Sequence, residues 1–149
     1  MSRIFLIHAL RDSVEPACTA MARFWPEADV VNLLDDSLSA DLARAGKLDA
    51  AMIARFVRLG RYARDQRADG ILFTCSAFGP AIEAVAAELP IPVLKPNESA
   101  FRAALAHGAR IGLLVTFPGS LAPLTEELQT MAGPDLELHA RVVPAALAA

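Results

Sequence analysis

The chain has 149 residues, which suits one domain or one and a half and is long enough to bury a hydrophobic core. Hydrophobic residues make up 54% of the chain and aromatic residues only 6%. The interior must therefore consist mainly of Ala, Leu, Val and Ile, a composition typical of a helix-covered sheet and unlike that of a disordered chain. The formal net charge is −3, without a basic stripe or Lys/Arg cluster, so we expect no nucleic-acid partner.

The two cysteines, Cys18 and Cys75, lie far apart and lack the spacing of a metal site or a disulfide framework. This cysteine usage fits a reducing, cytoplasmic setting. The apolar run at residues 4–7 is too short for a signal sequence or a membrane span. We therefore expect a soluble intracellular protein with no membrane partner.

Short apolar runs alternate with helical patterns along the first part of the chain. The patterns predict strands at 3–8, 28–33, 71–74 and 91–94, and helices at 13–24, 39–46, 49–68 and 80–89. Ser13 and Ser39 are expected to cap the first two helices, and Gly70 to end the third. Four arginines of the third helix fall mainly on one side, where a solvated outer face is favoured over an anion site: Arg55, Arg58, Arg61 and Arg64.

The rest of the chain continues the alternation. Strands are predicted at 110–115 and 136–143, and helices at 99–107, with Asn97 as its cap, and at 121–131. The β-α order predicts an α/β fold with a parallel sheet flanked by helices and right-handed connections. We expect a first α/β domain over residues 1–95 and an incomplete second one over 96–149, with similar strand-to-helix turns.

Cys75 occupies one such turn. It follows the apolar strand at 71–74 and precedes a helix whose start is marked by Pro80. Ligands of open α/β sheets bind at the carboxyl ends of strands, and backbone N–H groups and the helix dipole there favour a thiolate or a bound carboxylate. The alternative is that Cys75 is only a small buried hydrophobe. Position alone leaves both interpretations open.

Three segments carry a resemblance to a known family: Ala-Asp-Gly-Ile-Leu-Phe-Thr-Cys-Ser-Ala-Phe-Gly at 68–79, Pro-Val-Leu-Lys-Pro-Asn-Glu at 92–98, and Gly-Ala-Arg-Ile-Gly-Leu-Leu-Val-Thr-Phe-Pro-Gly-Ser at 108–120. Together they resemble the Asp/Glu/hydantoin racemase superfamily, which includes amino-acid racemases, hydantoin racemase, maleate isomerase and arylmalonate decarboxylase. The similarity extends from His8 to near the C-terminus. It implies two similar α/β domains of flavodoxin-like plan with the active site between them.

The resemblance also implies roles for individual residues. In that family one cysteine removes the proton beside a carboxylate and a second cysteine delivers a proton to the opposite face; Cys75 matches the first. The family pattern further implies that carboxylate binding involves Ser76, Ala77, Thr116 and Ser120, and that His8 lines the pocket. It implies a small carboxylate substrate, catalysis without a metal or pyridoxal phosphate cofactor, and a homodimer.

The second cysteine of the family pattern would lie beyond Ala149, so we expect the chain to be truncated there. Cys18 does not replace it, because its place in an amphipathic helix predicts a core residue. A lone Cys75 could still attack an activated double bond, as in maleate isomerase, or transfer a proton on one side only. The competing hypothesis is a non-catalytic remnant that binds a small carboxylate.

Each of the other candidates has a purely structural alternative. If they have no role in binding, Thr116, Ser120 and Asn97 are helix caps. His8 is otherwise a hydrogen-bonded histidine at a strand end. His107 and His139 lack partners at metal-ligand spacing and are interpreted as surface residues.

Overall fold

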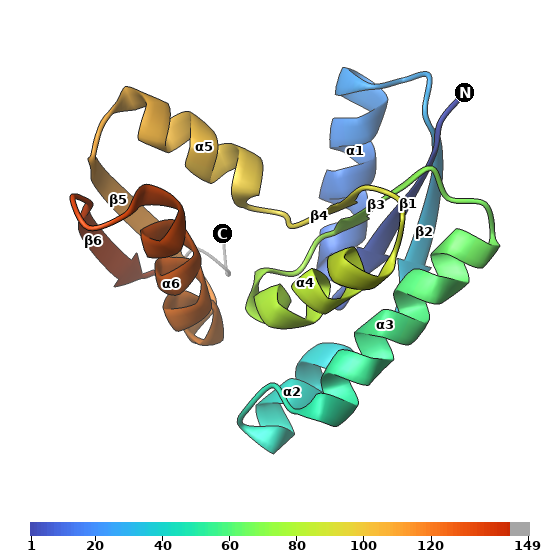
Figure 1. Cartoon of the computed structure of the whole chain (residues 1–149), viewed down its shortest axis with the longest axis horizontal. Coiled ribbons are helices and arrows are strands. Elements are labelled where there is room, and N and C mark those ends of the chain that lie inside the picture. The colour runs from blue at the N-terminus through green and yellow to red at the C-terminus, as the bar shows by residue number, and fades with distance from the viewer. Residues whose placement is uncertain (144–149) are drawn as a thin grey trace. The chain divides into compact units, whose positions relative to one another are not determined.

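The computed structural model describes residues 1–143. The chain forms two compact units, Met1–Pro96 and Asn97–Ala149, here called the first and second unit (Figure 1). Each has its own hydrophobic cluster. Within residues 1–143, no helix has the length and apolar character needed to cross a membrane.

The first unit is a four-stranded parallel sheet with the strand order β2-β1-β3-β4. Its strands are β1 Arg3–His8, β2 Asp29–Leu34, β3 Gly70–Phe73 and β4 Val93–Leu94. Its α-helices are α1 Val14–Phe24, α2 Leu38–Ala45, α3 Ala50–Asp65 and α4 Gly79–Glu88, and two 3-10 turns precede α1 and α4, η1 Arg11–Ser13 and η2 Ser76–Phe78. Helix α1 lies on one face of the sheet, and α3 and α4 lie on the other (Figure 1).

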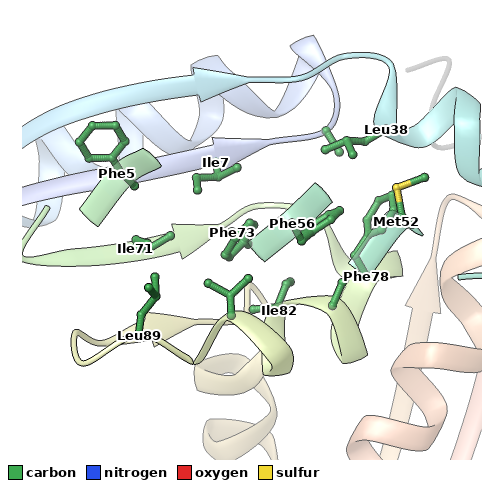
Figure 2. Packing of buried hydrophobic residues seen from close by; sticks show 14 of the residues in the cluster. Phe5, Ile7, Leu38, Met52, Phe56, Ile71, Phe73, Phe78, Ile82 and Leu89 are labelled. Atoms are coloured by element: carbon green, nitrogen blue, oxygen red, sulfur yellow. The ribbon is translucent and has the colours of Figure 1, made fainter. Parts of the chain in front are cut away.

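The main core of this unit lies between the sheet and helices α3 and α4 (Figure 2). Side chains alternate between the two faces of a strand, so β1 and β3 direct every second residue toward these helices. The buried residues on this side include Phe5, Ile7, Ile71 and Phe73 from the strands and Phe56, Phe78, Ile82 and Val85 from the helical side. Phe56 stacks on Phe73 and packs against Phe78, with ring centroids 5.3 and 4.7 Å apart. These aromatic contacts hold the segment after β3 against the core.

The second unit is smaller. It contains α5 Glu98–His107, β5 Arg110–Val115, η3 Pro118–Ser120, α6 Leu121–Ala132 and β6 Glu137–Val142. Strands β5 and β6 form a two-stranded parallel sheet. Its buried cluster is Phe101, Val115, Leu124 and Leu128. The residues on the face of β5 opposite this cluster are exposed, and Leu114 has 71% of its surface accessible.

These elements confirm the predicted α/β class with parallel strands flanked by helices. Helix α3 ends at Asp65 and not near Gly70, because Arg67 adopts a left-handed φ of 64° and turns the chain; Gly70 is instead the first residue of β3. The prediction that Gly70 ends this helix was wrong. Ser13 and Asn97 do stand at helix N-caps, although neither side chain makes a capping hydrogen bond.

The prediction that Ser39 caps the second helix was also wrong. Ser37 is the N-cap of α2, and Ser39 lies in its first turn. The hydroxyl of Ser39 donates to the backbone carbonyl of Ala9 at 3.1 Å. Its partner therefore belongs to the segment after β1 and not to the helix's own backbone.

Candidate active site

Cys75 lies two residues beyond Phe73, the last residue of β3, a strand with a neighbour on each side. Its backbone is extended, with φ −119° and ψ 118°, and the chain then enters η2 and α4. The side chain is half-buried and packs against the main core of the first unit. The backbone N–H of Ala77 and the side chain of Ser39 both favour the ionised form of its sulfur.

Burial raises the pKa of the Cys75 thiol above its ordinary value, and the hydrogen bonds from Ala77 and Ser39 offset only part of this effect. The expectation that helix termini favour the thiolate here was therefore wrong. The local N–H group does act in the expected direction, but desolvation of the half-buried sulfur outweighs it. At neutral pH the residue is a neutral thiol.

His8 ends β1 and is fully buried, with both ring nitrogens in hydrogen bonds. Its Nδ1 lies 2.9 Å from the Thr74 hydroxyl and 3.1 Å from the Ser13 hydroxyl, and its Nε2 lies 2.9 Å from Oδ1 of Asn32. Because Asn32 Oδ1 only accepts, Nε2 carries the proton and Nδ1 accepts from a hydroxyl. The Ser13 hydroxyl donates to the Leu10 carbonyl at 2.8 Å. The Thr74 hydroxyl, 2.9 Å from Nδ1 and 3.0 Å from the Ser13 oxygen, is then the donor available to Nδ1.

Cys18 belongs to this same cluster. Its thiol donates to Asn32 Oδ1 at 3.3 Å, and the side chain is only partly buried on α1. The prediction that Cys18 is a core residue was wrong, because α1 buries none of its residues fully and this position faces a polar acceptor on β2. Cys18 therefore bonds within the His8 cluster, whereas Cys75 packs against the main core of the first unit.

The alternation of side chains along β3 separates the two polar groups. Thr74 contacts His8 and Ser13, the last residue of η1. Cys75, the next residue, packs against the core cluster formed with α3 and α4. Thr74 and Cys75, adjacent residues at a strand end, therefore lie on opposite faces of the sheet.

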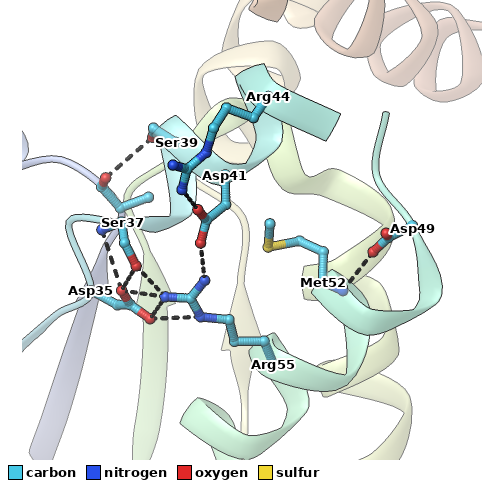
Figure 3. A network of polar contacts seen from close by, with 9 residues as sticks. Asp35, Ser37, Ser39, Asp41, Arg44, Asp49, Met52 and Arg55 are labelled. Carbon is cyan, nitrogen blue, oxygen red and sulfur yellow. Dashed lines mark hydrogen bonds and ion pairs between the residues drawn. The ribbon is translucent and has the colours of Figure 1, made fainter. Parts of the chain in front are cut away.

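An ion-pair cluster fixes the segment between β2 and α2 (Figure 3). Nε of Arg55 donates to Asp35 at 2.8 Å, and Nη1 donates to Asp41 at 2.6 Å. Asp35 also accepts from the Ser37 hydroxyl at 2.8 Å. Burial alone would raise the pKa of Asp35, but the hydrogen bonds from Ser37 and Arg55 and the charge of Arg55 together hold it below its usual range.

Arg55 therefore departs from the predicted solvated face, with only 26% of its side chain exposed. Sequence periodicity places it correctly on α3 but does not show that two carboxylates from other segments face it. Arg58, Arg61 and Arg64 are exposed, as predicted. Arg61 pairs with Glu88 of α4, and Arg64 pairs with its neighbour Asp65.

The proposed carboxylate-binding residues are distributed over both units. Ser76 is half-buried in η2, directly after Cys75. Ala77 is buried, and its N–H already serves the Cys75 sulfur. In the second unit Thr116 is exposed beyond β5, and Ser120 is buried at the N-cap of α6, where its hydroxyl makes no capping hydrogen bond.

Sequence reasoning did not identify three polar partners of His8: Ser13, Asn32 and Thr74. A signal existed for Asn32, which interrupts an otherwise apolar stretch of β2. His107 and His139 are exposed, as predicted. Over residues 1–143, no group of three or more His, Cys, Asp or Glu side chains is arranged to hold a metal ion.

Two solved structures have the same fold. The glutamate racemase of Aquifex pyrophilus has a TM-score of 0.71 and 19% identity, over 94% of this chain and 54% of that one. The glutamate racemase of Francisella tularensis subsp. tularensis SCHU S4, in complex with D-glutamate, has a TM-score of 0.67 and 15% identity, over 95% of this chain and 52% of that one. The chain thus spans about half the length of these relatives.

No curated protein matches the chain significantly. The sequence pattern that describes Asp/Glu/Hydantoin racemase matches residues 12–142, which is most of the chain and includes Cys75 and Thr116. The chain therefore belongs to the Asp/Glu/hydantoin racemase family.

Proposed function

We propose that the chain acts in a cofactor-independent racemase or isomerase, with Cys75 transferring a proton at the carbon next to a carboxylate of a small amino acid or related acid. The observation that supports this most is the half-buried Cys75 thiol, set beyond the end of an inner parallel strand and ahead of a helix. The family match over residues 12–142 supports the reaction class.

The raised pKa of Cys75 determines how such a transfer depends on pH. A neutral thiol can donate a proton to a carbanion, whereas proton abstraction needs the thiolate. Because burial raises the pKa, the thiolate forms only in alkaline solution in the absence of substrate. We expect the rate of proton abstraction by the free protein to rise with pH through the alkaline range, above the ordinary thiol pKa of about 8.5.

The developing negative charge on the substrate needs donors placed beforehand. Ser76, in η2 directly after Cys75, is proposed to bind the substrate carboxylate, and Thr116 and Ser120 of the second unit are proposed as further ligands. His8 is fully buried with both nitrogens in use, so its proposed pocket-lining role is better described as support for Thr74. The resemblance-based homodimer remains a proposal, which sedimentation analysis tests.

Cys18 does not supply a second acid for Cys75, since its thiol is committed to Asn32 in the His8 cluster. One-sided proton transfer is therefore the step that this chain's own residues support. Such a step exchanges the substrate's α-proton with solvent and does not by itself invert the carbon.

The experiment is to incubate the full chain in D₂O with D- and L-glutamate, D- and L-aspartate, hydantoins and malonates, and to follow deuterium uptake by mass spectrometry. We expect uptake into at least one compound, a loss of at least about a hundredfold in Cys75→Ala through removal of the acid-base group, and wild-type exchange in Cys18→Ser. Absence of exchange with every compound would contradict the proposal.

A second candidate function is binding of a small carboxylate without turnover. The neutral state of Cys75 at neutral pH favours this candidate, because a protonated thiol is no base. It predicts no deuterium uptake by the wild-type chain and unaltered ligand affinity in Cys75→Ala, measured by calorimetry with the same compounds. Release of carbon dioxide would instead identify a decarboxylase-like reaction. Conversion of a cis double bond to trans would identify a maleate-isomerase-like reaction.

A further inference from the structure

We propose that Thr74, His8 and Asn32 form a second nucleophilic site, in which the Thr74 hydroxyl attacks the acyl carbon of a small carboxylic ester. The site lies on the face of the sheet opposite Cys75 and makes no use of that thiol. It therefore goes beyond the proposed proton transfer. It is carried by the contacts of one buried histidine.

A nucleophile, a base and a side chain that orients the base lie in sequence across three strand ends. Oγ1 of Thr74, after β3, lies 2.9 Å from Nδ1 of His8, the last residue of β1. On the other side of the ring, Nε2 of His8 lies 2.9 Å from Oδ1 of Asn32 in β2. The strands are neighbours in the order β2-β1-β3, so each contact joins one strand to the next. These distances match those of a hydroxyl beside a base that a third group orients.

The proton positions favour transfer from Thr74 to the histidine. Because Oδ1 of Asn32 accepts the Nε2 proton, Nδ1 presents a lone pair to the Thr74 hydroxyl. The Cys18 thiol also donates to Oδ1, at 3.3 Å, so two donors from different elements hold the amide oxygen. Ser13 is the competing hydroxyl, 3.1 Å from Nδ1, but its proton goes to the Leu10 carbonyl at 2.8 Å. Thr74 is therefore the nucleophile that this arrangement assigns.

Burial differs between the three side chains. His8 is fully buried, whereas Thr74 is half-buried and Asn32 is exposed. The imidazole is thus shielded from water, while the hydroxyl lies at the carboxyl edge of the sheet, where ligands of α/β sheets bind. Oγ1 of Thr74 also lies 3.0 Å from the hydroxyl oxygen of Ser13, the N-cap of α1. The positive end of that helix dipole favours negative charge developing beside the nucleophile.

The acyl transfer balances with the ester and water as the other reactants. The Thr74 oxygen forms a bond to the acyl carbon while its proton passes to Nδ1 of His8. The bond between that carbon and the leaving oxygen breaks, and a phenolate departs with the electron pair. The proton on His8 passes to solvent, and water then cleaves the acyl-threonine to release the acid. Asn32 touches only the histidine, so it is a positioning residue that fixes the ring and its tautomer.

The test uses the full chain with both thiols removed, as Cys18→Ala and Cys75→Ala, because cysteines also accept acyl groups. This parent is incubated with p-nitrophenyl acetate at pH 7, and acetylated residues are located by mass spectrometry of its peptides. We expect an acetyl group on Thr74, and in Thr74→Val a loss of at least about tenfold in the initial release of p-nitrophenolate. Thr74→Ser should retain most of that rate. Thr130→Val is the matched control, because this hydroxyl donates to the Glu126 carbonyl on an exposed part of α6; its rate should stay within about twofold of the parent.

Asn32 is tested by two substitutions that differ in one property. Asn32→Leu removes the acceptor of the Nε2 proton and should slow the release at least about tenfold. Asn32→Asp keeps an acceptor and adds a charge that stabilises the imidazolium, so its rate should equal or exceed that of the parent. A merely structural role would not separate the two rates in this way. Trp25 fluorescence checks that each variant is folded.

Three results would each overturn the proposal: no acetyl group on Thr74, an acetyl group on Ser13 in its place, or equal rates in Asn32→Leu and Asn32→Asp. Mapping of the acetyl group on the parent needs no substitution at the site, so it decides the proposal even if a variant does not fold. Because the parent lacks Cys75, the outcome is also independent of the deuterium uptake that tests the proposed function. Uptake by the wild-type chain without acetylation of Thr74 leaves only the proton transfer, and the reverse leaves only the ester site.

Discussion

The two strand-to-helix turns after β3 and β5 have the same order of elements but differ in how deeply their residues are buried. Each begins with a threonine after a parallel strand, Thr74 or Thr116, and continues through a 3-10 turn into a helix. Beyond β3, Ala77 and Phe78 are buried and Cys75 is half-buried. Beyond β5, the segment 116–119 is exposed. The similar local sequence pattern thus gives a packed turn in one unit and an open one in the other.

The difference follows from the number of strands and helices beside each turn. Strand β3 has a neighbour on both sides, and its turn packs under α3 and α4. Strand β5 pairs only with β6. A half-buried thiol with a raised pKa therefore depends on the wider sheet and not on the turn sequence alone. Four substitutions, each with a matched control, test this conclusion.

Phe78→Ala should have the largest effect. The ring is fully buried and packs on Phe56 at 4.7 Å between centroids, so we expect a loss of about 3–5 kcal/mol in the free energy of unfolding of the first unit. Phe117→Ala in the other turn removes a ring that is 49% exposed and should cost less than about 1 kcal/mol. Hydrogen exchange of the β3 and β5 amides, resolved by mass spectrometry, measures each unit separately. Equal losses would contradict the difference in packing.

Gly60→Ala comes next. A Cβ at this position of α3 would lie 2.5 Å from Cγ1 of Val85 on α4, a contact closer than carbon atoms tolerate. Overpacking of about 1–3 kcal/mol exceeds the gain of about 1 kcal/mol in helix propensity, so the net loss should be about 1–2 kcal/mol. Urea unfolding followed by Trp25 fluorescence measures it in the first unit.

The control for Gly60 is Gly112→Ala in β5, where the same added atom meets nothing within 4 Å. We expect β5 amide exchange there to change by no more than about 0.5 kcal/mol in opening free energy. In a Val85→Ala background the cost of Gly60→Ala should shrink, because the contacted methyl group is gone. If the cost persists, the close approach of α3 and α4 is not its cause.

The sequence allowed the elements of both units to be predicted, because apolar periodicity and Gly or Pro boundaries are local signals. Strand β5 was predicted with its observed ends, and Pro80 indicated the start of α4 within a residue. Cys75 was placed correctly between strand and helix for the same reason. Its role stays a prediction.

The side-chain environment was less predictable, because it depends on segments distant in sequence. Arg55 meets Asp35 and Asp41, 20 and 14 residues away, and a helical pattern contains no sign of these partners. Ser39 near a helix start suggested a cap, although its hydroxyl donates to the carbonyl of Ala9. Helix-dipole reasoning gave the wrong direction for the Cys75 pKa, because burial is decided by the whole unit.

Arg55→Met tests whether the ion-pair cluster adds stability that the second unit lacks. Removing the guanidinium leaves Asp35 partly buried without its main cation, and we expect a loss of about 1–2 kcal/mol at pH 7. Because Arg55 and Ser37 hold the folded-state pKa of Asp35 low, this stabilisation is present above the unfolded carboxyl pKa of about 3.9 and is lost as the pH falls below it.

The measurement for Arg55→Met is urea unfolding at pH 7, 5 and 3, followed by Trp25 fluorescence. The difference between wild type and variant should be nearly constant from pH 7 to 5 and should shrink toward pH 3, where Asp35 takes up a proton. Arg44→Met is the control: Arg44 pairs with Asp41 but its side chain is 77% exposed, so the change should stay below about 1 kcal/mol. A pH-independent difference would assign the effect of Arg55 to packing of its aliphatic part.

Thr74→Val and Thr116→Val should have the smallest effects on stability. They are also the most closely matched pair, since the two residues begin the two turns. Valine keeps the shape of threonine but removes the hydroxyl that donates to Nδ1 of the buried His8, so Thr74→Val should cost about 1 kcal/mol. The Ser13 hydroxyl, 3.1 Å from the same nitrogen, can replace the donor only by giving up the Leu10 carbonyl. Thr116 is exposed, so Thr116→Val should change β5 amide exchange by less than about 0.5 kcal/mol. Equal costs would show that the threonine serves the turn itself, whereas a cost confined to Thr74 ties it to the histidine that the larger sheet buries.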